Sequence, residues 1–259
     1  MLVRHDSRGA VVIGQPSHAW ISGQLARAWG NERFGAVEPF EEVCLAAEQH
    51  DLGMAMWDLE PMRNPESGLP ASFLQMAIPD HVELWTLAPR RLLRQSRYAA
   101  LLVSLHGTRL YANRDLGPLP ARERSLVLEF LDGQRRLQHG LLETLRADPR
   151  TAASAADPVV ARNSGLIGTW DTLSLALCLD YAPYTVNGVP AAGAPVEVAL
   201  SETDRPGRLG LEPWPFRTAS LVVRCEGQRL VATYSDDAAM NDALAQAPWE
   251  TLEFELAPA

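Results

Sequence analysis

Lysine is absent from this chain of 259 residues, in which all 23 basic side chains are arginine. A P-loop and a pyridoxal Schiff base both depend on a lysine, as does any lysine nucleophile, so these chemistries are excluded. An anionic ligand would have to be recognised by arginine or by a metal ion.

Cysteine is scarce as well. Cys44, Cys178 and Cys225 are far apart in sequence and form no C-x-x-C pair, and an odd number does not suit a disulfide framework. The first residues lack the apolar core of a signal peptide, and no apolar run approaches the roughly 20 residues that span a bilayer. These absences favour a cytoplasmic protein with reduced cysteines and no membrane partner.

Basic residues are fewer than acidic ones, so the formal net charge is -9 at pH 7. Such a chain repels phosphate backbones and anionic lipid surfaces, so a nucleic-acid partner is not expected. A small-molecule substrate is expected instead. The length suits one large domain better than several separate cores.

Three segments of the chain differ in their hydrophobic pattern. Residues 1–15 predict a β-hairpin, residues 16–180 predict a helical metal-binding domain, and residues 181–259 hold short β-branched runs that predict a C-terminal β appendage packed on the helical body. The expected helices cover approximately residues 17–29, 40–52, 80–96, 97–107, 121–147 and 158–179. The expected fold class is therefore mainly α, a helical bundle with a small antiparallel β-sheet from the C-terminal segment and the N-terminal hairpin.

The histidines carry the most informative pattern. Four of the six lie on apolar faces of predicted helices: His18, His50, His81 and His106. One such histidine is usually a hydrogen-bonded core residue, but four on separate helices are harder to explain in that way. Asp171 lies among apolar residues of its own helix, where an unpaired carboxylate would carry a large desolvation cost. His5, in the hairpin, and His139, on a charged helix face, are not candidates.

These residues resemble the ligand set of the HD-domain superfamily, in which a His, an adjacent His-Asp pair, further His residues and a distant Asp come from separate helices. The matching positions are His18, His50, Asp51, His81, His106 and Asp171. More closely, the segments QPSHAWISGQLARAWG, HDLGMAMWD, AALLVSLHGTRLY and WDTLSLALCL resemble the family of proteins of unknown function DUF3891. The resemblance implies an HD-domain-like bundle and supplies no established activity.

The resemblance also implies a dinuclear metal site with Asp51 as the bridging ligand. Imidazoles and carboxylates suit first-row divalent ions, and one carboxylate can bridge two ions about 3.5 to 4 Å apart. Two divalent or mixed-valent ions, iron or manganese, are the expected cofactors. His81 and His106 argue for the second ion, because superfamily members with one metal lack them. His50, Asp51 and His106 would form the catalytic centre.

Three further side chains are candidates for substrate binding. Trp57 and Arg63 follow the His-Asp pair, and Arg109 follows His106, so all three could line a pocket beside the metals. Arginine is well suited to bidentate recognition of phosphate. Surface ion pairs explain the two arginines equally well.

Three functions fit this pattern. The first is hydrolysis of a small phosphoester or nucleotide, the commonest activity in the superfamily that the sequence resembles. The second is a mixed-valent di-iron oxygenase of the myo-inositol oxygenase type, which has a similar set of ligands. The third is a non-catalytic metal-binding sensor or interaction module. The residue types alone do not separate the first two.

Overall fold

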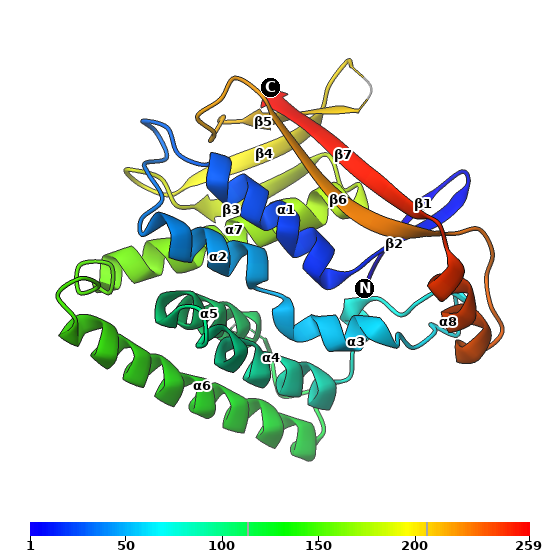
Figure 1. The fold of residues 1–259 in the computed structure, drawn as a ribbon, viewed down its shortest axis with the longest axis horizontal. Coiled ribbons are helices and arrows are strands. Elements are labelled where there is room, and N and C mark those ends of the chain that lie inside the picture. Colours follow the sequence, from blue (N-terminus) through cyan, green and yellow to red (C-terminus); the bar gives the residue numbers. More distant parts are fainter. Residues whose placement is uncertain (113, 206) are drawn as a thin grey trace.

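The computed structural model describes residues 1–112, 114–205 and 207–259 and combines a helical layer with a large β-sheet (Figure 1). The helices are α1 (Gln15–Ala28), α2 (Phe40–Gln49), α3 (Ala55–Leu59), α4 (Ile78–Leu92), α5 (Arg97–Ala112), α6 (Ala121–Ala147), α7 (Asp157–Leu179) and α8 (Asp237–Gln246), with 3-10 turns η1 (Leu52–Met54) and η2 (Phe73–Gln75). The six helices predicted from hydrophobic periodicity are therefore confirmed. Helices α3 and α8 were not predicted.

The sheet is built from both ends of the chain. Its strands are β1 (Leu2–Asp6), β2 (Gly9–Ile13), β3 (Tyr184–Val189), β4 (Val196–Glu202), β5 (Arg208–Glu212), β6 (Leu221–Leu230) and β7 (Trp249–Pro258). Their order across the sheet is β1-β2-β6-β7-β5-β4-β3. The N-terminal hairpin joins the C-terminal strands through antiparallel pairing of β2 with β6, whereas β5 and β7 run parallel.

The predicted fold class is wrong on two counts. Across the described residues the sheet is large, with seven strands, so the protein is not mainly α with a small sheet. The sheet is also mixed. The chain leaves β6 through α8 and returns as β7, which lies between β6 and β5, antiparallel to β6 and parallel to β5. The sequence showed β-branched runs, but alternation along a strand indicates which face is buried and not which strand is its neighbour.

The sheet covers α1 and α7. These two helices contact each other and pack against the sheet. Trp29 at the end of α1 packs edge-to-face on Trp170 of α7 and on Phe216, which precedes β6. On the side of α1 and α7 away from the sheet lie α2 and α5, followed by α4 and α6 (Figure 1). No helix within the described residues has the length and apolar character required to cross a membrane.

Candidate metal centre

Five of the six predicted ligands converge where these layers meet. His18 comes from α1, His50 and Asp51 from the end of α2, His106 from α5 and Asp171 from α7. Two groups of three, His18 with His50 and Asp51, and His50 with His106 and Asp171, each hold their donor atoms within 4.8 Å of one another. Because four helices supply them, the helical packing itself fixes the geometry of the cluster.

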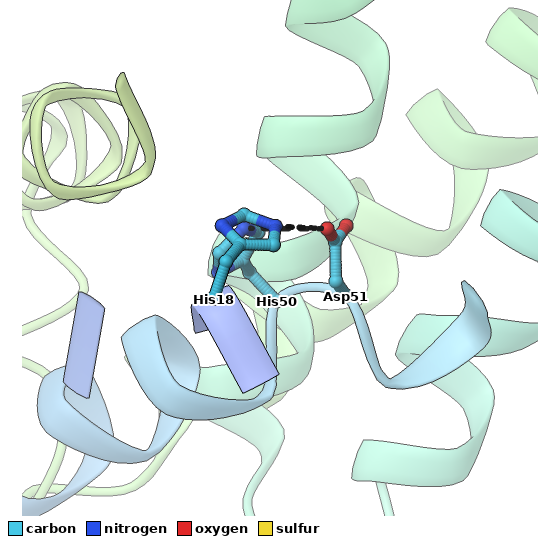
Figure 2. A group of neighbouring side chains, drawn as sticks. All are labelled: His18, His50 and Asp51. Carbon is cyan, nitrogen blue, oxygen red and sulfur yellow. Dashed lines mark hydrogen bonds and ion pairs between the residues drawn. The ribbon is translucent and has the colours of Figure 1, made fainter. Parts of the chain in front are cut away.

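His18 presents one ring nitrogen to Asp51 and the other to a serine. Its Nε2 lies 2.7 Å from Asp51 Oδ2, and its Nδ1 lies 2.9 Å from Ser174 Oγ. A dashed line marks the contact with Asp51 in Figure 2. The Ser174 hydroxyl donates to the carbonyl of Asp171 at 2.8 Å, so its oxygen accepts from His18 Nδ1–H. In the neutral ring, Nε2 therefore carries a lone pair that points at a carboxylate.

His50 has the same arrangement. Its Nδ1 lies 2.8 Å from the carbonyl oxygen of Ala47, which can only accept, so Nδ1 carries the hydrogen. Its Nε2 lies 3.3 Å from Asp171 Oδ1 and 3.7 Å from Asp51 Oδ2. Among the described residues this buried nitrogen has no hydrogen bond. A lone pair that faces two carboxylates requires a cation between them, either a proton or a metal ion.

His106 completes the cluster from the side of α5. Its Nε2 lies 3.6 Å from Asp171 Oδ2, and its ring packs edge-to-face on that of His50 with the centroids 5.2 Å apart. Its buried Nδ1 has no hydrogen-bond partner in the described part of the chain. His106 is therefore a further imidazole in the cluster, and its Nδ1 makes no hydrogen bond to a described protein group.

The electrostatics of the cluster match this geometry. Burial opposes the charged form of His50, but the carboxylates of Asp51 and Asp171 outweigh it and raise the pKa of His50 to about 9. Burial lowers the pKa of His106 to about 4, with only partial opposition from Asp171. The pKa of Asp171 lies below its usual range, because the surrounding imidazoles outweigh the effect of burial. Without a metal ion, His50 holds the proton that stands in for the cation.

His81 lies apart from this cluster. Trp85 Nε1–H donates to His81 Nε2 at 3.2 Å, so in the neutral ring Nδ1 carries the hydrogen and donates to the Tyr111 hydroxyl. Burial lowers the pKa of His81 and favours this neutral form. Both ring nitrogens are thus engaged by protein groups, and His81 belongs to neither group of converging donors.

The three predicted substrate-binding residues lie outside the lining of the cavity beside the cluster. Trp57 is half-buried in α3 and packs on the hydrophobic core. Arg63 pairs its backbone with Pro70 and donates its backbone N–H to Asp237 at 2.7 Å. The guanidinium of Arg109 packs over Gly168 of α7, where Nη1 lies 3.1 Å from the position that a Cβ would take.

A cavity of about 260 Å³ opens onto the cluster. Its floor is polar and is formed by His18, Asp51, His106 and Asp171. Its walls are mostly apolar: Met54, Phe73, Leu74, Met76, Ile78, Trp85, Leu110 and Leu175. Gln15, His81 and Arg114 complete the lining. A small molecule in this cavity would touch the floor and the apolar walls together.

The family model described as "Protein of unknown function (DUF3891)" matches residues 1–232. The chain belongs to the DUF3891 family. The comparison with curated proteins and the comparison with solved structures gave no match. The matched residues include the whole cluster and the cavity lining, whereas α8 and β7 follow the matched region.

The site of this DUF3891 protein also contains residues that the sequence analysis missed. Ser174 orients His18, and its position three residues after Asp171 places both on one helical face, which the sequence could have revealed. Gln15, one turn before His18, could have been found in the same way. Tyr111 and Arg114 gave no signal, because their relation to His81 and the cavity depends on how α5 packs against α4.

Proposed function

We propose that this protein is a metal-dependent hydrolase of the HD-domain type that acts on a small phosphoester or nucleotide. What supports a metal is the orientation of His18 and His50. Each donates Nδ1–H to a protein oxygen and turns the lone pair of Nε2 toward a carboxylate. Histidines that bind metals are held in this way by an acceptor behind the ring.

The donor set fits first-row divalent ions such as manganese and iron. The metal would be held by the five residues whose donor atoms fall into two converging groups: His18, His50, Asp51, His106 and Asp171. Bound ions polarise a phosphoryl oxygen and lower the pKa of a bound water.

The remaining work falls to the protein. Ser174 and Ala47 fix the two imidazoles, and mostly apolar side chains line the cavity beside them. Arg114, at the cavity, attracts an anionic substrate to a chain of negative net charge. Hydrolysis adds one water to phosphorus and breaks the ester P–O bond, and the products are inorganic phosphate and the alcohol.

The test combines metal content with activity. Protein purified without oxygen would be analysed for metals and assayed for phosphate release from a panel of phosphomonoesters and nucleotides. His50→Ala and Asp51→Ala should lose metal and activity together, whereas His139→Ala should keep both, because His139 lies on the exposed face of α6 with three quarters of its side chain accessible. The rise in melting temperature on adding Mn²⁺ should disappear in the first two variants only.

Other results would redirect the assignment. Substrate-dependent oxygen uptake by the iron-loaded protein, without phosphate release, would indicate a di-iron oxygenase of the myo-inositol oxygenase type. Protein that binds no metal and is as stable as protein treated with Mn²⁺ would indicate a sensor or interaction module.

A further inference from the structure

The cavity beside the cluster has an apolar mouth, which is unusual for a site that acts on highly polar phosphates. Leu74 on η2 and Leu110 on α5 both line it, yet 77% and 44% of their surfaces stay accessible. Exposed leucines at a cavity indicate a surface that an apolar group can cover. Phe73, Met76 and Ile78 continue this apolar wall inward.

The apolar wall is held in place by its own hydrogen bonds. Ser72 and Gln75 form a capping box around η2, and the backbone N–H of Phe73 donates to the carbonyl of Met1 at 3.1 Å. The side-chain oxygen of Gln75 accepts from the backbone N–H of Ser72, so this polar side chain stabilises the turn. The wall is therefore formed before any ligand arrives, which lowers the entropic cost of binding.

Gln15 supplies an independent sign of a ligand. Its side chain is 97% buried, since only 3% of its surface is accessible, and it lines the cavity. Within the described residues its buried Oε1 has no hydrogen-bond partner. A buried amide oxygen without a hydrogen bond is costly, so binding becomes more favourable when a ligand supplies an O–H or N–H to Oε1 of Gln15.

We propose that this cavity binds phosphomonoesters of apolar alcohols or phenols. The monoprotonated phosphate lies on the polar floor and donates its O–H to Oε1 of Gln15, and the alkyl or aryl group contacts Phe73, Leu74 and Leu110. This proposal rests on the hydrolytic function proposed above and narrows its substrate class. Cavities that bind small molecules measure about 300 to 1,000 Å³, so this smaller one suits a short ester better than a large nucleotide.

The first experiment compares two substrates of similar size and different polarity. Phosphate release by the manganese-loaded protein would be measured with hexyl phosphate and with glycerol 2-phosphate. We expect kcat/KM to be at least about tenfold higher for hexyl phosphate, because each methylene in an apolar pocket contributes about that much discrimination or more. Equal values of kcat/KM for both esters would refute the apolar subsite but not the proposed hydrolytic function.

The second experiment measures binding without turnover. Hexylphosphonate and methylphosphonate resist hydrolysis, and calorimetric titration would give their affinities for the metal-loaded protein. Preference for hexylphosphonate without any phosphate release from esters would support the subsite and refute the hydrolase. Equal affinity for both phosphonates would refute the subsite.

Variants at the mouth separate the subsite from general effects of substitution. Leu74→Ser combined with Leu110→Ser should reduce the preference for hexylphosphonate about tenfold and leave methylphosphonate unchanged. Leu128→Ser is the matched control, because Leu128 on α6 is 49% exposed and lies outside the cavity lining. An unchanged preference in the double variant would contradict the proposal.

Gln15→Met tests the polar contact. Met has a similar length and no hydrogen-bonding amide, so the free protein should melt at a higher temperature while both phosphonates bind several-fold more weakly. A variant that binds both phosphonates as tightly as the wild type would show that Gln15 does not contact the ligand.

Discussion

Without a bound metal ion, the stability of this protein should depend on the protonation of His50. The carboxylates of Asp51 and Asp171 raise the pKa of the buried His50 from 6.5 to about 9 in spite of the opposing effect of burial. A group with a raised folded pKa contributes stability that is fully present below its unfolded pKa and is lost as the pH rises through the folded pKa. The affected window is therefore about pH 6.5 to 9.

The size of the effect follows from the same values. Each pH unit between the folded and unfolded pKa corresponds to about 1.4 kcal/mol, so the rise from 6.5 to about 9 corresponds to a loss on the order of 3 kcal/mol across the window. His106 contributes little there, because burial lowers its pKa to about 4 in the folded protein and most of its imidazole is also neutral in the unfolded chain above pH 6.5.

Urea unfolding in the presence of a chelator, from pH 6 to pH 9.5, measures this loss. The His50→Gln variant is the control, since subtracting its unfolding free energy at each pH cancels other titrating groups such as the buried N-terminal amine. The difference between the two proteins should decline by about 3 kcal/mol across the window. A difference that stays constant with pH would refute the placement of a proton on His50.

Further predictions concern other parts of the site and the fold. His81→Ala should leave the metal content of the protein unchanged, because Trp85 and Tyr111 already engage both ring nitrogens; elemental analysis would detect a loss. Gly53→Ala should lower the unfolding free energy by about 1 to 3 kcal/mol, because its Cβ would lie 2.6 Å from a backbone oxygen of α4. Arg229→Leu should lower the melting temperature measured by calorimetry, because the guanidinium is buried and pairs with Glu250 at 2.6 Å.

The convergence of these histidines and aspartates could be predicted to a large extent because it follows from helical periodicity. His18, His50 and His106 each share a face with apolar residues of one helix, so burial of that face also buries the imidazole. Asp171 follows the same rule. The sequence does not specify how the helices pack, and for that reason it could not show that His81 turns toward Tyr111 and away from the other histidines.

The sheet was harder to predict because its pairings join distant parts of the chain. The β5 strand, RLGLE, is short and contains a glycine, so it carries little alternation. Its parallel neighbour β7 follows it only after β6 and α8. Local pattern identified β-rich sequence near the C-terminus, but neither the mixed topology nor the size of the sheet is encoded locally.

The sheet and the cluster form one structural unit. His18 on α1 is held by Ser174 on α7, and both helices pack under the sheet, so the distance between them depends on that support. His50, Asp51 and His106 come from α2 and α5 on the other side of α1 and α7. The cluster therefore spans the contact between a layer supported by the sheet and a purely helical layer. A change in how the sheet supports α1 or α7 would move His18 relative to Asp51 and alter the cluster without changing any of its own residues.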